Sequence, residues 1–164
     1  MYRTDMEPTI GELSHSLLGH DSLMTPFLTA RFGSISARQR LMTFGKSTFS
    51  RQSKLCRKSD GELILEATLL ISEPSIPEAM LRQLQREDTP FGLLLAEHGL
   101  ATTIAERALY FKSNSDPTMV RWGRRHFILN ADDESRICQV DELLVPEAEL
   151  VRLSKLMERG SDGV

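Results

Sequence analysis

The chain has 164 residues, of which 40% are hydrophobic and 26% are charged, and its formal net charge is -3. This length and composition are typical of one globular domain with its own core. The acidic balance argues against a general nucleic-acid-binding surface, and no apolar run approaches the roughly 20 residues that span a bilayer. The opening residues, MYRTDMEPTI, lack the apolar core of a secretory signal, so we expect a cytoplasmic protein.

The first part of the chain predicts two helices and then three strands. Residues 9–18 have helical spacing, and residues 23–32 form a second helix that ends at Gly33, with Asp21 or Ser22 as its cap. Strands are expected where the pattern alternates or favours β-structure, with an Asp60-Gly61 turn before the third: 34–42, 46–56 and 62–71. One face of the third strand carries its apolar residues: Leu63, Leu65, Ala67, Leu69 and Ile71.

The next part of the chain predicts a pair of helices. A Ser75…Glu78 capping box opens a helix over residues 75–87, and Thr89-Pro90 open a short one that ends at Gly99. Free N–H groups at such a helix start can bind a carboxylate, although most bind only a cap. Residues 102–112 fit either a helix or a strand.

The last part of the chain predicts a hairpin and a helix. Residues 120–129 and 136–145 are strands joined by a polar turn, and a helix begins at Pro146-Glu147. The apolar stripe expected on this helix contains Leu150, Leu153 and Leu156 or Met157. Runs of strands joined by short turns pair in antiparallel fashion, so the sequence predicts an α+β fold.

Two adjacent acids interrupt the apolar segment ICQVDELLVP. Because alternate side chains of a strand point to opposite faces, Glu142 shares a face with Cys138, Val140 and Leu144, while Asp141 lies on the other. Glu142 has no cation on its own face of this strand. It is either a structural carboxylate that pairs with an arginine from another strand, or a general acid or base whose pKa burial raises.

A second charged residue falls on an apolar face at Arg51, which alternates with Phe49, Ser53 and Leu55. Such an arginine is costly unless it is paired, and its planar fork suits a bound carboxylate. The alternative is that its head group extends to solvent.

Basic residues also gather in RWGRRH. The same alternation puts Arg124 and His126 on one face and Arg125 on the other. A solvated strand end is the simpler interpretation of this group.

The number and spacing of the cysteine and histidine residues do not indicate a metal site. Cys56 and Cys138 fall on predicted strands and are expected to be small buried hydrophobes in a reducing cytosol. The four histidines have no HExxH or similar spacing, and no CxxC pair is present.

Several motifs, in order along the chain, resemble those of the chorismate lyase (chorismate pyruvate-lyase) family. They are RxxxLC with DGE (Arg51, Leu55, Cys56 and residues 60–62), TPxG (residues 89–92), WGRR followed after a hairpin by ELxxP (residues 122–125 and 142–146) and, more weakly, MT (Met24-Thr25). The resemblance covers residues from about 20 to 147. It rests on the order and spacing of these motifs taken together.

The resemblance implies an antiparallel β-sheet backed by helices, with a ligand pocket beneath helical flaps. It implies a lyase that converts chorismate to 4-hydroxybenzoate and pyruvate with no metal or organic cofactor. Substrate binding is carried over to Met24, Arg51, Phe91 and Glu142, with main-chain amides supplied by Met24 and Phe91. Catalysis is carried over to Glu142, as general acid, and to Arg51. The expected partners are the small-molecule substrate and product, with no nucleic acid and no membrane.

The sequence also differs from the family pattern at several positions. The Asp60-Gly61 turn is two residues longer than in the family, Phe91 replaces the usual leucine, and Thr29 stands where relatives often have an acid. We expect one chorismate lyase-like domain over residues 1–164, with residues 1–19 as an extension and residues 147–164 as a carboxyl-terminal helix and tail.

Two other functions are open. The UTRA effector-binding domains of bacterial transcription regulators resemble the same fold and bind small molecules without catalysis. They usually follow a winged-helix domain, for which the residues before the matching region are too few. A lyase that acts on a related chorismate-like substrate is the second alternative.

Overall fold

The alternating segments of the sequence fold into one antiparallel sheet. The computed structural model describes residues 7–86, 89–113, 116 and 119–161. Its strands are β1 (Ile35–Phe44), β2 (Thr48–Arg57), β3 (Leu63–Ser72), β4 (Thr102–Lys112), β5 (Arg121–Asn130) and β6 (Arg136–Leu144). Its helices are α1 (Glu12–Leu18), α2 (Met24–Phe32), α3 (Glu78–Arg86), α4 (Phe91–Glu97) and α5 (Glu147–Ser161), with a 3₁₀ turn η1 (Glu73–Ser75). The predicted α+β class is confirmed.

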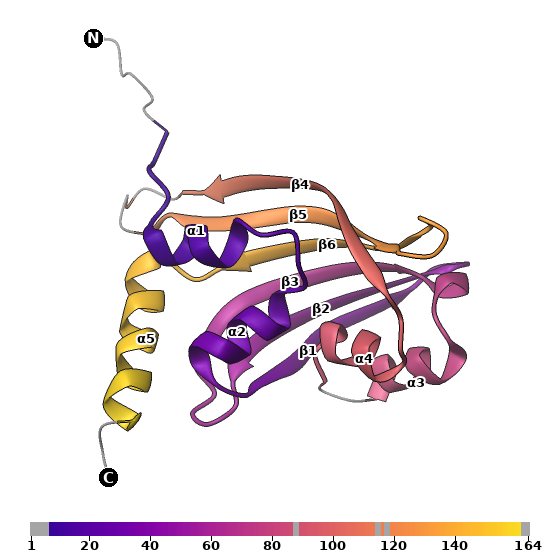
Figure 1. Ribbon diagram of the computed structural model, residues 1–164, viewed down its shortest axis with the longest axis horizontal. Helices are drawn as coiled ribbons and strands as arrows, with labels where there is room; N and C mark the ends of the chain where they lie inside the picture. Colours follow the sequence, from indigo (N-terminus) through magenta and orange to yellow (C-terminus); the bar gives the residue numbers. More distant parts are fainter. Residues whose placement is uncertain (1–6, 87–88, 114–115, 117–118, 162–164) are drawn as a thin grey trace.

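Strand order in the sheet is β1-β2-β3-β6-β5-β4, and every neighbouring pair is antiparallel. The sheet therefore consists of two meanders, β1-β2-β3 and β4-β5-β6, that join where β3 pairs with β6. Helices α3 and α4 lie in the connection that carries the chain from β3 in the middle of the sheet to β4 at its edge (Figure 1). In the described part of the chain, no helix is both long enough and apolar enough to cross a membrane.

Helices α1 to α4 lie over one face of the sheet and α5 lies at its end (Figure 1), and the buried apolar residues of the strands pack against them. Within the described residues, the buried hydrophobic side chains form two clusters. One joins α1, α2 and α5 to the sheet through residues such as Leu28, Leu65 and Leu150. The other joins α3 and α4 to the sheet through residues such as Ile71 and Leu94. The apolar face predicted for β3 is confirmed, because Leu65, Ala67, Leu69 and Ile71 are buried and Leu63 is partly buried.

The first residue of α5 holds the start of α1 in place. Oε1 of Glu147 accepts a hydrogen bond from the backbone N–H of Leu13, at 2.8 Å. Oε2 accepts one from the backbone N–H of Ser14, at 2.9 Å, and one from the Ser14 hydroxyl, at 2.6 Å. A Cβ atom at Gly11 would overlap the Glu147 side chain, so a larger residue there would require the carboxylate to move. The carboxylate thus satisfies N–H groups that an α-helix leaves unpaired at its start.

Both predicted amino-terminal caps are wrong. Helix α2 begins after Leu23 with no side-chain cap, and Asp21 instead pairs with Arg107, whose Nε is 2.8 Å from its carboxylate. Ser75 lies in η1 and donates its hydroxyl to the carbonyl oxygen of Arg136. In each case a long-range partner takes the side chain that the local pattern assigned to a cap. Residue 87, the last of the predicted helix, lies outside the described residues.

Two further expectations are settled by the structure. Residues 102–112, which fitted either a helix or a strand, form β4. On α5, Leu150 and Leu153 are buried as expected, whereas Leu156 is exposed, so the apolar stripe does not extend to it. The side chain of Met157, the alternative to Leu156, lies outside the described part of the chain.

Candidate functional site: a pocket between two core clusters

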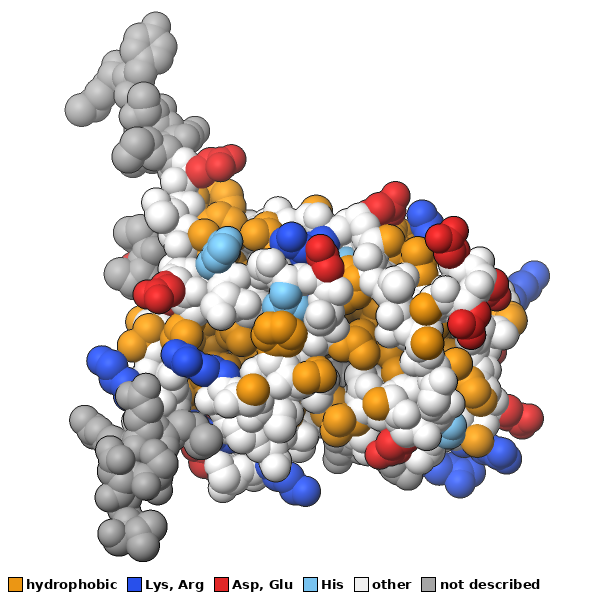
Figure 2. Space-filling view, in the orientation of Figure 1, with side chains coloured by type: hydrophobic (Ala, Val, Ile, Leu, Met, Phe, Trp, Pro, Cys, Tyr) orange, Lys and Arg blue, Asp and Glu red, His pale blue; other side chains and the backbone are white. Residues whose placement is uncertain are grey.

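A pocket lies on the helix-covered face of the sheet, where the two core clusters meet. It has about 490 Å³ of empty space, counting the part open to solvent. Hydrophobic side chains reach the surface along the junction between α2 and α4 (Figure 2). The pocket-lining residues come from the starts of α2 and α4 and from five strands: Leu23, Met24, Thr25, Ala37, Arg51, Ser53, Leu55, Ala67, Leu69, Pro90, Phe91, Gly92, His126, Ile128, Val140 and Glu142.

Two neighbouring rows of paired residues form much of the pocket floor. The first row crosses the sheet from Arg51 through Leu69 and Val140 to His126. The second row runs from Ser53 through Ala67 and Glu142 to Arg124. Small residues at Ser53 and Ala67 leave space above the sheet where larger ones would fill it. Polar groups therefore stand at both sides of an apolar floor.

The roof of the pocket is made by the first turns of α2 and α4. Met24 and Phe91 are the first residues of these helices, and neither preceding residue, Leu23 or Pro90, provides a side-chain cap. The helices approach closely, since a Cβ atom at Gly92 would lie 3.0 Å from Oγ1 of Thr25. This approach is a physical reason for glycine in the TPFG segment.

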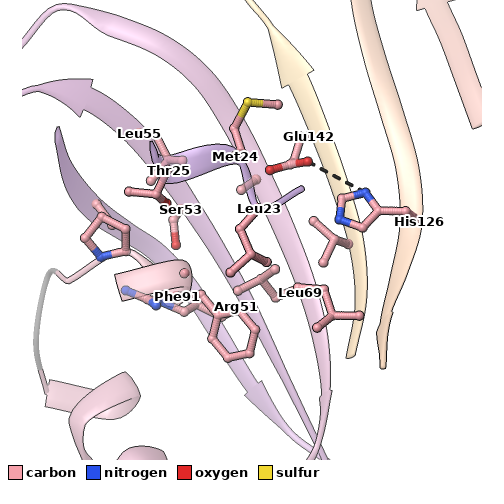
Figure 3. Close-up of a pocket in the computed structure, with 16 residues that line it drawn as sticks. Leu23, Met24, Thr25, Arg51, Ser53, Leu55, Leu69, Phe91, His126 and Glu142 are labelled. Atoms are coloured by element: carbon pink, nitrogen blue, oxygen red, sulfur yellow. Dashed lines mark ion pairs between the residues drawn. The ribbon is translucent and has the colours of Figure 1, made fainter. Parts of the chain in front are cut away.

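Arg51 is fully buried on β2 and lines the pocket, so the alternative that its head group extends to solvent is wrong. Its Nη2 donates a hydrogen bond to the backbone oxygen of Thr89, at 3.0 Å. This contact ties the guanidinium to the segment immediately before α4. Arg51 and Phe91 lie together at one side of the pocket (Figure 3).

Glu142 lies across the pocket from Arg51 (Figure 3) and forms a buried ion pair with Arg124. Nε of Arg124 donates to Oε1 of Glu142 at 2.7 Å. The same guanidinium donates to the backbone oxygens of His20, at 2.7 Å, and Ser22, at 2.9 Å. Glu142 therefore has a cation, which comes from β5 as in the structural alternative, and Arg124 is not part of a solvated strand end.

The pKa of the Glu142 carboxyl is set by two opposing effects. Burial raises this pKa because the pocket removes water from the charged form, while the Arg124 guanidinium opposes the shift. The net direction is upward. A carboxyl group in this position can hold a proton at a higher pH than one in water, as a general acid requires.

His126 is a pocket residue that was not among the predicted site residues. Its Nδ1 lies 3.7 Å from Oε1 of Glu142, too far for a hydrogen bond, and has no partner among the described residues. Burial, together with the Arg124 charge, lowers the pKa of His126 to about 3, so the ring is neutral at pH 7. The alternation that placed His126 beside Arg124 was its only signal in the sequence.

The structure brings together the four residues that the motifs assigned to substrate binding. Met24, Arg51, Phe91 and Glu142 are separated in the sequence by up to 118 positions (142 − 24), yet all line this pocket. Asp141 lies on the opposite face of the sheet, where it bonds to the hydroxyl of Tyr110 and, at 2.9 Å, to Nε of Arg125.

The two cysteines lie outside the pocket lining. Cys56 and Cys138 are buried and free, as expected, and burial raises the pKa of each thiol. Among the described residues, no group of three or more His, Cys, Asp or Glu side chains could hold a metal ion. A comparison of the sequence with protein-family models gives no match, and no curated protein matches it either.

Proposed function

We propose that the chain is an enzyme of the α+β class that binds a small ring-bearing carboxylic acid. The particular activity that we infer is that of a chorismate lyase, which forms 4-hydroxybenzoate and pyruvate. One observation carries the proposal: the four residues assigned by separate motifs meet in one pocket. Chorismate and 4-hydroxybenzoate are the proposed partners, and the reaction needs no metal or organic cofactor.

The Arg51 side of the pocket suits a carboxylate. A buried guanidinium is a strong partner for this group, and the backbone N–H groups at the starts of α2 and α4 lie nearby. Arg51 and the Met24 and Phe91 amides would hold a substrate carboxylate here. The ring would then extend over Leu69 and Val140 toward Glu142.

Glu142 supports a proton transfer at the other side. In the proposed reaction the ether C–O bond breaks, a ring hydrogen leaves as a proton, and the enolpyruvate takes up a proton to become pyruvate. The numbers of protons released and taken up are equal. Glu142, in the protonated form that its burial favours, would donate to the ether side as negative charge develops there, and its carboxylate would then remain paired with Arg124. Aromatisation supplies much of the driving force, so orientation and one placed proton are the main requirements.

Helices α2 and α4 also support a closed site. They begin above the pocket and approach each other at Thr25 and Gly92, so they would act as the flaps beneath which the ligand is held. An aromatic acid in such a site leaves only when the flaps open. The proposal therefore includes inhibition by 4-hydroxybenzoate, and steady-state rates measured up to millimolar product would detect it.

The decisive experiment is incubation of the purified protein with chorismate and no added cofactor. Formation of 4-hydroxybenzoate and pyruvate in equal amounts supports the lyase. The ion pair of Glu142 with Arg124 favours one alternative, a non-catalytic binder of the UTRA type, because it gives the carboxylate a structural role. Binding of 4-hydroxybenzoate without turnover of chorismate would identify such a binder. Turnover of a related substrate alone would identify the other alternative, a lyase of different specificity.

A further inference from the structure

His126 is a buried polar residue of the pocket that takes no part in the proposed chemistry. Its imidazole is almost completely buried, lines the pocket, and lies in the same cross-sheet row as Arg51. Burying a polar ring with an unpaired nitrogen is unfavourable unless a partner completes its hydrogen bonds. No described residue provides a partner for Nδ1.

The orientation of the ring indicates where the partners of His126 would be. Its nitrogen-bearing edge is turned toward Glu142 and the cavity (Figure 3). Nδ1 faces the carboxylate at 3.7 Å, and a movement of about 1 Å would bring the two groups to hydrogen-bond distance. Contacts of this kind are often long without ligand and tighten when one binds. A carboxylate at Nδ1 favours the tautomer with the proton there, which leaves Nε2 as an acceptor.

A ligand held by Arg51 would present its far end to this acceptor. Arg51 and His126 are three strands apart in one row, which separates their Cα atoms by about 14 Å. A ring whose carboxylate meets Arg51 places its para substituent toward His126 and Glu142. A hydroxyl group there has one proton to donate, which a neutral imidazole can accept.

We propose that His126 is a ligand-binding residue that accepts a hydrogen bond, through Nε2, from the para hydroxyl of the bound ring acid. This inference rests on the proposed function and adds a determinant of specificity to it. Sites that are built to hydrogen-bond a hydroxyl discriminate strongly against analogues that lack it, because their buried polar groups are then left unpaired. His126 would thus distinguish 4-hydroxybenzoate from benzoate.

The test compares the affinities of 4-hydroxybenzoate and benzoate at pH 7.5, measured by calorimetry on the full chain. We expect His126→Leu to weaken 4-hydroxybenzoate binding about 10-fold to 100-fold and to change benzoate binding less than about 3-fold. His126→Gln carries an amide at the position of Nε2 and should restore most of the affinity, whereas His126→Asn reaches only the position of Nδ1 and should not. His15→Leu, at an exposed position, is the matched control.

The outcomes separate this inference from the proposed function. Unchanged 4-hydroxybenzoate binding in folded His126→Leu, or an equal loss for both acids, would overturn the hydroxyl contact and leave the lyase proposal standing. If the unmodified protein neither binds 4-hydroxybenzoate nor converts chorismate, the proposed function fails and this inference fails with it. Circular dichroism establishes whether each variant folds. If His126→Leu does not fold, the test is the comparison of His126→Gln with His126→Asn, and equal 4-hydroxybenzoate affinities of these two variants would overturn the hydroxyl contact.

Discussion

Arg124 and Glu142 form an ion pair between neighbouring strands, with Nε of Arg124 2.7 Å from Oε1 of Glu142. Both side chains are buried. The two residues are directly paired in the register of β5 and β6. Because Arg124 also binds the backbone oxygens of His20 and Ser22, it connects the sheet to the segment between α1 and α2. The pair is therefore part of the fold, and one of its members, Glu142, also lines the pocket.

Removal of Arg124 alone should be strongly destabilising. Arg124→Met leaves the Glu142 carboxylate buried without its cation, so we expect the free energy of unfolding to fall by about 3–5 kcal/mol. The double variant Arg124→Met/Glu142→Leu should lose less than the sum of the two single variants. Urea denaturation of all four proteins measures this coupling, and Arg125→Met, whose guanidinium is exposed, should show a much smaller loss. Additive losses would contradict an energetic coupling of the pair.

Glu142→Gln should lower kcat for chorismate by about 10²-fold to 10⁴-fold, the range typical of general acid catalysis. The amide has nearly the same shape as the acid but cannot transfer a proton. Asp141→Asn is the matched control, because Asp141 is the adjacent residue and lies on the opposite face of the sheet. The rate of pyruvate release at saturating substrate measures kcat for both variants. Full activity of Glu142→Gln would refute the assignment of this residue as the acid.

Arg51→Met should weaken binding more than it slows the chemical step. The methionine keeps part of the apolar stem but removes the charge that would hold the substrate carboxylate, so we expect KM to rise about 10-fold to 100-fold. Lys54→Met, on the opposite face of the same strand, should leave KM unchanged. Initial rates over a range of chorismate concentrations distinguish KM from kcat. A fall in kcat with no change in KM would place Arg51 in the chemical step instead.

The pH dependence of stability should report His126. Its pKa is about 3 in the folded chain, below its ordinary value of 6.5, so the unfolded chain binds more protons between these pH values. The stabilisation is fully present above pH 6.5 and is lost as the pH falls toward 3. Within this window the slope is about 1.4 kcal/mol per pH unit for this one group. His20 acts in the same direction, since burial and Arg124 lower its pKa to about 4.

The measurement is the free energy of unfolding in urea at pH 4.5, 5.5 and 6.5. His126→Gln removes the titrating ring, so its stability should fall less steeply with decreasing pH than that of the unmodified protein. Parallel curves for the two proteins would show that His126 is not held neutral in the folded chain.

Local alternation was sufficient to predict most of the sheet and the faces of its strands. It placed Arg51 and Glu142 on the covered face because the residues two positions before and after each of them are mostly apolar. Strand β4 could not be assigned in this way, because a bulge interrupts its alternation. Glu106 adopts a φ of 56°, and the register with β5 shifts between Ala105 and Ala108. An extra residue in a strand shifts the face of every residue that follows.

The partners of the site residues depend on register and could not be predicted from one strand at a time. Arg124 meets Glu142 only because β5 and β6 pair with these residues opposite each other. His126 was placed correctly beside Arg124, but its nearness to Glu142 required the same register. The caps failed for a related reason, since Asp21 and Ser75 bind residues far away in the sequence.

The contact of Glu147 with the start of α1 has a consequence for the order in which the chain assembles. The hydrogen bonds from Leu13 and Ser14 span 134 and 133 positions of sequence. A helix of seven residues is too short to be stable alone, so α1 depends on its packing and on this distant carboxylate. The hydrogen bonds that complete the start of α1 can therefore form only once the chain has been made as far as residue 147.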